Sequence, residues 1–106
     1  MSKYNARRVR ADGHTFDSRA EYRRYCELVL LERAGAIRDL RVHPRYELLP
    51  KADGLRAVHY VGDFEYREGD VVVCEDVKGV KTPVFRLKAN LFRRVYPHIE
   101  LRIVEV

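Results

Sequence analysis

The spacing of apolar residues along the chain switches between a period typical of helices and one typical of strands. Helical spacing predicts a first helix that begins at Ser18 and ends at Gly35, and a second that begins at Pro83 and ends before Pro97. Alternation at every second position predicts strands over residues 37–42, 45–49, 57–66, 71–78 and 99–106. The order is helix, three or four strands, helix, strand, which predicts a mixed α/β domain.

Each predicted helix carries an apolar stripe that we expect to face the core. In the first helix, Ser18 and Glu21 fit a capping box, in which each side chain satisfies a free backbone N–H group of the first turn. The stripe of this helix consists of Tyr22, Tyr25, Cys26, Val29 and Leu30. The stripe of the second helix consists of Val84, Leu87, Leu91 and Val95, joined by Phe85 and Phe92.

Asp76 and Lys78 are two positions apart on the strand predicted over residues 71–78, so both project from the same face of the sheet. Glu75 faces the opposite side and is excluded from that site. A surface ion pair between Asp76 and Lys78, which would contribute little to stability, is the structural alternative to a functional role.

Asp63, on the strand paired with residues 71–78, joins the same face if the hairpin loop has an even number of residues. With two or four loop residues, Asp63 lies opposite Cys74, and its Cα atom is roughly 7–8 Å from that of Asp76. A three-residue loop would place Asp63 opposite Glu75 instead.

Two carboxylates and a lysine that face one pocket are suited to phosphodiester hydrolysis. Clustered carboxylates repel each other and need a proton, a cationic side chain or a metal ion to neutralise them. Magnesium binds through carboxylate oxygens, waters and substrate phosphates. A neighbouring lysine can orient a water molecule or offset the charge that builds on the phosphate in the transition state.

Composition restricts the class of protein. A chain of 106 residues is long enough for one domain and too short for two. No apolar run approaches the roughly 20 residues needed to span a bilayer, and the polar N-terminus lacks the apolar segment of a secretory signal, so we expect a cytoplasmic protein. The 4 histidines are scattered, with no pair at ligand spacing on one element, which argues against a zinc site.

The net charge of +5 is concentrated in two segments. Residues 81–96 hold five basic side chains and no acidic one (Lys81, Arg86, Lys88, Arg93, Arg94), and basic residues also outnumber acidic ones over residues 1–24. Such segments suit a polyanionic partner, and solvated helix faces are the alternative. Residues 1–15 form either a basic arm or a short hairpin around Asp12 and Gly13. The candidate DNA contacts are Arg7, Arg8, Arg10, Lys81, Arg86, Lys88 and Arg93.

These motifs resemble the PD-(D/E)XK nuclease superfamily. Glu21 in DSRAEYRRY matches the acid of the family's first helix, Asp63 in YVGDFEY matches its aspartate, and Asp76-Val77-Lys78 matches its (D/E)-x-K element. More narrowly, the chain is similar to small phage-encoded Holliday junction resolvases, in the KYNA start, the FDS-x-x-E helix entry and the DVKG-x-KT segment. The sequence departs from the family at Gly62, where proline is usual.

The resemblance implies a restriction-endonuclease-like core in αβββαβ order, with residues 1–15 as a basic arm and residues 16–106 as the nuclease domain. It implies a divalent-metal-dependent endonuclease that resolves four-way DNA junctions as a homodimer, in the host cytoplasm if phage-encoded. Asp63, Asp76 and Glu21 would hold Mg²⁺ or Mn²⁺, and Lys78 would position or activate the attacking water.

Three alternatives remain open from the residues. Glu21 has a sufficient local explanation as a helix cap, and only the resemblance gives it a role at the metal. Lys88 could be solvated, bind the DNA backbone or approach the scissile phosphate. The protein as a whole could be a non-catalytic DNA-binding module of the same fold, or a nicking or recombination endonuclease of other specificity.

Overall fold

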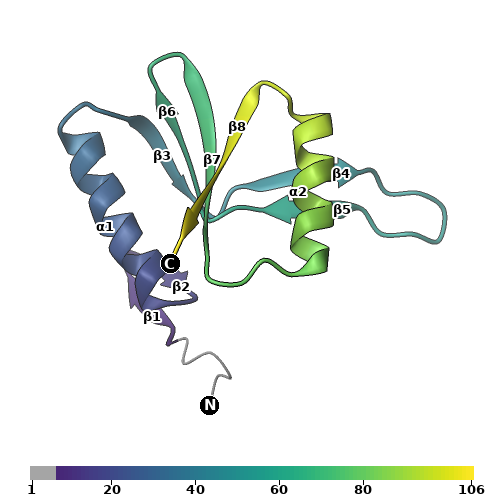
Figure 1. The fold of residues 1–106 in the computed structure, drawn as a ribbon, viewed down its shortest axis with the longest axis horizontal. Helices are drawn as coiled ribbons and strands as arrows, with labels where there is room; N and C mark the ends of the chain where they lie inside the picture. Colours follow the sequence, from purple (N-terminus) through teal and green to yellow (C-terminus); the bar gives the residue numbers. More distant parts are fainter. Residues whose placement is uncertain (1–6) are drawn as a thin grey trace.

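A mixed sheet occupies the centre of the computed structural model, which describes residues 7–106 (Figure 1). Across this part of the chain, four strands lie side by side in the order β3 (Arg38–Val42), β6 (Phe64–Glu68), β7 (Val71–Lys78) and β8 (Ile99–Glu105). Strand β6 is antiparallel to both β3 and β7, whereas β8 runs parallel to β7. Parallel strands need a long crossover, and helix α2 (Pro83–Val95) provides it. The predicted single α/β domain with a mixed sheet is therefore confirmed at this level.

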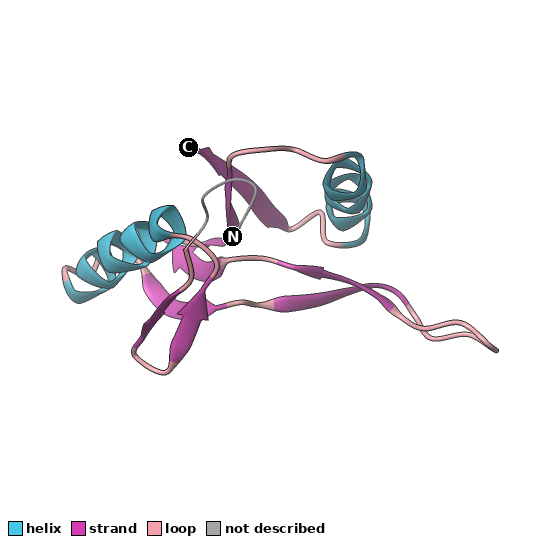
Figure 2. Cartoon of the chain, turned by 90° about the horizontal axis from the view of Figure 1, so that it is seen from below, coloured by secondary structure: helices cyan, strands magenta, loops and turns pink. Residues whose placement is uncertain are grey.

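Within the described residues, two further hairpins flank this sheet. Strands β1 (Val9–Ala11) and β2 (His14–Phe16) pair and lead into helix α1 (Arg19–Arg33). Residues 7–15 thus adopt the hairpin alternative rather than a free arm, whereas the KYNA motif lies outside the described residues. Strands β4 (Arg45–Leu49) and β5 (Val58–Val61) form the second hairpin, which projects away from the rest of the chain (Figure 2).

The prediction of one continuous strand over residues 57–66 is wrong. The chain bends at Gly62 and Asp63, so that β5 pairs with β4 and β6 pairs with β3 and β7. Backbone hydrogen bonds hold the bend against a second corner of the chain: Gly62 N–H donates to Pro44 O at 2.9 Å, and His43 N–H donates to Asp63 O at 2.9 Å. The bend leaves the alternation of buried and exposed residues intact, so the sequence period alone could not reveal it.

Gly62 is required by the close packing at this bend. A Cβ atom there would lie 2.6 Å from Cys74 Sγ and 3.4 Å from Pro44 Cγ. Proline, which is usual at this position in the family that the sequence resembles, would meet the same atoms. It would also lack the N–H group that donates a hydrogen bond to Pro44 O. The departure from the family pattern is therefore explained by the local structure.

The hairpin between β6 and β7 has a two-residue turn, Gly69 and Asp70, because the strands extend to Glu68 and Val71. The expected even loop length is confirmed. The register differs from the prediction, however: Phe64 pairs with Glu75 and Glu65 pairs with Cys74, so Asp63 does not lie opposite Cys74. Asp63 comes just before the paired stretch, where its N–H group donates to Glu75 O at 3.0 Å.

Two apolar clusters cover opposite faces of β7. On the α1 side, Val73 packs with Phe64, Tyr66 and Leu28, all 1% exposed or less. On the α2 side, the members of the cluster are Tyr46, Leu48, Tyr60, Cys74, Ala89 and Phe92. The central strand is therefore buried on both sides.

The predicted core stripes of the helices need correction. In α2, Phe92 and Ala89 are buried, whereas Val84 and Leu87 are 63% and 62% exposed. The helix turns its aromatic face inward because Phe92 packs edge-on against Tyr46, with ring centroids 4.9 Å apart. In α1, Leu28 is the buried apolar residue, and Tyr22 and Tyr25 pack against the cluster to which it belongs. Cys26 and Leu30, which the predicted stripe included, are exposed.

The contact at Gly62 predicts a specific double-mutant result. Gly62→Ala should lower the free energy of unfolding by about 1–3 kcal/mol, because the new Cβ overlaps Cys74 Sγ. Adding Cys74→Ala to Gly62→Ala should recover part of this loss, although Cys74→Ala alone is destabilising. Urea denaturation of the wild type, both single variants and the double variant measures the coupling. Strictly additive losses would contradict the proposed overlap.

Candidate metal centre

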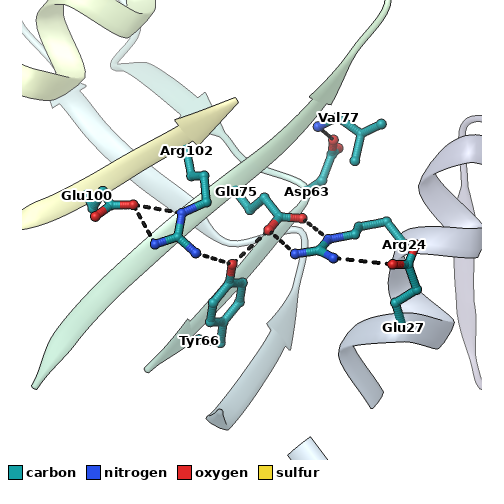
Figure 3. Close-up of polar contacts among 8 residues, drawn as sticks. All are labelled: Arg24, Glu27, Asp63, Tyr66, Glu75, Val77, Glu100 and Arg102. Atoms are coloured by element: carbon teal, nitrogen blue, oxygen red, sulfur yellow. Dashed lines mark hydrogen bonds and ion pairs between the residues drawn. The ribbon is translucent and has the colours of Figure 1, made fainter. Parts of the chain in front are cut away.

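The four predicted site residues meet where α1 begins, the chain bends before β6, and β7 ends. Glu21 lies in the first turn of α1, Asp63 at the bend, and Asp76 and Lys78 on β7. Asp63 Oδ2 accepts a hydrogen bond from the backbone N–H of Val77 at 2.7 Å, which fixes its carboxyl group against β7 (Figure 3). Glu21 and Asp76 are 4% and 1% exposed, respectively, so both carboxyl groups are buried beside the sheet.

Glu21 combines the two roles that the sequence analysis treated as alternatives. Ser18 Oγ accepts a hydrogen bond from Glu21 N–H at 3.1 Å, which confirms the predicted helix cap. The carboxylate of Glu21 uses Oε2 to accept a hydrogen bond from Asp17 N–H at 3.2 Å. Its Oε1 points the other way and lies 2.7 Å from His43 Nε2. The side chain of Glu21 therefore binds the N–H group of the residue before the N-cap, rather than that of Ser18 itself, and its other oxygen faces His43.

His43 is a site residue that the sequence analysis missed. Ligand atoms of Glu21, His43 and Asp63 all lie within 4.8 Å of one another, so this cluster could hold a metal ion. These residues come from three separate parts of the chain, so no ligand spacing within a single element connects them. The one available signal was the His43-Pro44 dipeptide at the end of a predicted strand, which marks a fixed corner.

Asp76 carries a buried oxygen that lacks a hydrogen-bond partner. Its Oδ2 accepts a hydrogen bond from the hydroxyl of Tyr60, whereas Oδ1 has no hydrogen bond among residues 7–106. The ammonium group of Lys78 lies 3.9 Å from Oδ1, at the outer limit of an ion pair. Buried carboxylate oxygens are normally satisfied, so this atom is available for a further cation.

Burial changes the protonation behaviour of both aspartates. Loss of hydration raises the pKa of Asp63 to about 6, opposed by the Val77 N–H group and reinforced by the charge of Glu21. Loss of hydration likewise raises the pKa of Asp76 to about 6; the charge of Lys78 and the nearby backbone N–H group of Asp63 oppose this shift, and the charge of Glu21 reinforces it. Because Glu21 acts on both aspartates, the three carboxyl groups share one electrostatic environment that favours a bound cation.

Lys78 is held in place by α2. Its Nζ atom lies 4.8 Å from the centroid of the Phe85 ring, within the range of a cation–π contact. The side chain is 30% exposed, so the ammonium group can meet both Asp76 and a ligand that arrives from solvent.

A second buried carboxylate, Glu75, lies on the other face of β7 and is fully paired. Arg24 of α1 donates to both its oxygens, at 2.7 and 2.9 Å, and Tyr66 OH donates to Oε1 at 2.7 Å (Figure 3). This arrangement agrees with the exclusion of Glu75 from the site. It also ties α1 to β7 one helical turn after Glu21, and so fixes the position of Glu21.

The predicted DNA-binding residues lie in two parts of the described structure. Lys81, Arg86 and Arg93 line a groove of about 240 Å³ between α2 and β8, together with Phe85, Ala89, Asn90 and Ile103. Lys88 is half-buried and lies outside this groove. In the second part, Arg7, Arg8 and Arg10 are exposed in or just before the hairpin β1–β2, which leads into α1 (Figure 1).

The whole chain, residues 1–106, matches the family described as Protein of unknown function (DUF1064), and the protein therefore belongs to that family. No curated protein matches the chain, and no solved structure does. Over the described residues, neither helix has the length and apolar character needed to cross a membrane.

The raised pKa of Asp76 predicts a stabilising substitution. With a folded-state pKa of about 6 and an ordinary value of 3.8, the wild type loses stability as the pH rises from about 4 to about 6. Asp76→Asn avoids this loss, so without divalent metal it should be more stable at about pH 7.5, by up to about 3 kcal/mol. The gain should shrink towards zero near pH 4.

Urea denaturation in the presence of a chelator, at both pH values, measures this difference. Asp53→Asn, at an exposed turn residue, is the matched control and should show no gain at either pH. A variant that is less stable than wild type at about pH 7.5 would show that the ionised Asp76 is already compensated within the protein.

Proposed function

We propose that this protein is a divalent-metal-dependent DNA endonuclease. The single observation that supports the proposal most strongly is the buried Asp76 carboxylate, whose Oδ1 finds no hydrogen-bond partner in the described part of the chain. It lies beside Lys78 and shares its electrostatic environment with Asp63 and Glu21. Buried carboxylates whose oxygens are satisfied only in part are characteristic of sites that bind a cation.

The residues present fit a divalent cation. Glu21 and Asp63 belong to the cluster whose ligand atoms lie within 4.8 Å of one another, and Asp76 adds a buried oxygen without a hydrogen-bond partner among the described residues. These three carboxylates would hold the ion, since they offer oxygen ligands of the kind that Mg²⁺ and Mn²⁺ prefer. When bound, such an ion would supply positive charge that neutralises the carboxylates and polarises a phosphodiester group.

The protein's own groups have separate tasks in this proposal. Lys78 places a positive charge where negative charge builds on the phosphate during hydrolysis, and its ammonium group can also orient the attacking water. Phe85 limits the positions that this side chain can take. Tyr60 holds one oxygen of Asp76 and leaves the other free for the cation. The backbone N–H of Val77 does the same for Asp63.

The order of elements supports a restriction-endonuclease-like core as part of this proposal. When the hairpins β1–β2 and β4–β5 are set aside, the described chain runs α1, β3, β6, β7, α2, β8. Read in this way, the element order supports the αβββαβ core that the resemblance implies. The additional hairpin is inserted between β3 and β6, at the two corners that carry His43 and Asp63.

The basic groove beside α2 supports DNA as the substrate. Phe85 lines the groove and its ring also contacts the ammonium group of Lys78, so the groove adjoins the candidate metal centre. Lys81 also pairs with Glu105 at 2.6 Å, which leaves Arg86 and Arg93 as the principal candidates for phosphate contacts. One site cuts one strand, so paired incisions across a four-way junction require a second copy of the chain. A junction-resolving homodimer is the form of the proposal we favour.

Cleavage of defined substrates tests the proposed activity. Purified protein should cut a synthetic four-way junction in the presence of Mg²⁺ or Mn²⁺, and should cut a linear duplex of the same sequence more slowly. Asp76→Asn and Lys78→Met should each lower the rate by about 100-fold or more. Lys78→Met keeps an unbranched side chain of similar length beside Phe85 but removes the charge, and with it the cation–π contact.

Asp53→Asn is again the control and should cleave as wild type does. An intact junction after incubation with either metal would overturn the proposal. Binding without cutting would instead favour a non-catalytic DNA-binding module, and nicks in one strand only would favour a nicking endonuclease.

The salt dependence of DNA binding tests whether the groove beside α2 contacts phosphate groups. In a chelator, which prevents cleavage, Arg86→Ala and Arg93→Ala should each weaken junction binding. Each should also reduce the slope of log K against log salt concentration by about 0.9 if one phosphate contact is lost. Arg38→Ala, at an exposed position on the edge strand β3, is the control. An effect of Arg38→Ala equal to that of the groove variants would show that the groove has no special role.

A further inference from the structure

His43 contributes an imidazole nitrogen to a site that otherwise consists of carboxylate oxygens. Its Nε2 lies 2.7 Å from Glu21 Oε1, and the two groups share a cluster with a carboxylate oxygen of Asp63. The three ligand atoms lie within 4.8 Å of one another. Ligands on opposite sides of an ion, each at about 2.2 Å, are roughly 4.4 Å apart, so the cluster has the dimensions of a coordination sphere.

The backbone holds His43 in this position despite a conformational cost. Its φ is 53°, in the left-handed region that residues with a Cβ atom rarely adopt. The conformation is maintained because His43 N–H donates to Asp63 O, and Gly62 N–H donates to Pro44 O, both at 2.9 Å. The same two hydrogen bonds therefore hold the imidazole of His43 and the carboxyl group of Asp63 at adjoining corners of the chain.

The hydrogen bond between Glu21 and His43 is buried at one end and open to solvent at the other. Glu21 is 4% exposed and His43 lies at the rim of the site, with its side chain 34% exposed. In the metal-free protein, His43 Nε2 and Glu21 Oε1 share one hydrogen bond, which satisfies both atoms. A metal ion that accepts both nitrogen and oxygen ligands can replace this hydrogen bond with two coordinate bonds. An ion that binds only oxygen ligands would not coordinate His43.

We infer that His43 is a direct metal ligand and makes this a site for a first-row transition-metal dication, such as Mn²⁺, in preference to Mg²⁺. The inference rests on the proposed metal-dependent function and specifies its cofactor. Mg²⁺ is a hard cation that binds oxygen ligands in octahedral geometry. Imidazole nitrogen favours transition metals over Mg²⁺, so one histidine in a carboxylate site shifts the selectivity between the two ions.

Mn²⁺ binding to the purified protein, with no DNA present, tests the inference directly. The paramagnetic resonance signal of free Mn²⁺ disappears on binding, which gives the affinity, and Mg²⁺ affinity follows from displacement of Mn²⁺. Pulsed measurements on bound Mn²⁺ should show coupling to a directly coordinated nitrogen. In His43→Asn this coupling should vanish, and Mn²⁺ affinity should fall by about tenfold or more, whereas Mg²⁺ affinity should change much less.

Asparagine is the substitution of choice because it tolerates the left-handed conformation of residue 43 and offers an oxygen in place of the nitrogen. His98→Ala, at an exposed position, is the matched control and should keep the nitrogen coupling. The wild-type measurement alone can overturn the inference, since bound Mn²⁺ without nitrogen coupling excludes His43 as a ligand. Equal losses of Mn²⁺ and Mg²⁺ affinity in folded His43→Asn would also overturn it, because the role would then be structural.

These results separate the inference from the proposed function. Nitrogen-coordinated Mn²⁺ in a protein that cuts no DNA would support the role of His43 and refute the nuclease proposal. Metal-dependent cleavage by a protein that binds Mn²⁺ without nitrogen coupling would support the nuclease proposal and refute the role of His43.

Discussion

Strand β7 carries two neighbouring carboxylates, Glu75 and Asp76, that are 0% and 1% exposed, and the rest of the structure depends on how each is compensated. An ionised carboxylate removed from water costs several kcal/mol unless it is paired. Glu75 faces α1 and is satisfied by Arg24 and Tyr66. Asp76 faces the other side, where Tyr60 and Lys78 satisfy it only in part. The Glu75 carboxylate therefore binds α1 to the sheet through Arg24, whereas the Asp76 carboxylate remains available for a cation.

The two faces of β7 work together because α1 takes part in both. Arg24 binds Glu75 one helical turn after Glu21, and Glu21 contributes its charge to the environment of Asp76 and Asp63. The helix cap at Ser18 fixes the start of the same helix. A buried ion pair on one side thus determines the geometry of the candidate metal centre on the other. The rigidity that metal coordination would require thus comes from interactions outside the candidate ligand set.

Much of the fold followed from local sequence patterns. The strand over residues 71–78, the cap at Thr82 with Pro83 in the first turn, and the mixed α/β class were all predicted and are confirmed. The strand over residues 57–66 and the apolar stripe of α2 were not predicted correctly. Both errors have one cause: alternation and helical spacing report which residues are apolar, but several faces of a segment can satisfy the same pattern. Long-range packing then chooses between them, as the ring of Phe92 does against Tyr46.

The sequence by itself determined that Asp76 and Lys78 share a face, because side chains two apart on a strand always do. It also determined the helix cap that contains Glu21, since capping depends on residues within one turn. The tertiary structure alone decided that the carboxyl group of Asp63 lies against β7 at Val77, that Glu21 at the start of α1 faces His43, and that His43 lies in the cluster of candidate ligands. These facts concern distances between segments far apart in the chain. Such distances depend on hydrogen bonds at the bend, on the register of a hairpin and on packing, which no local periodicity encodes.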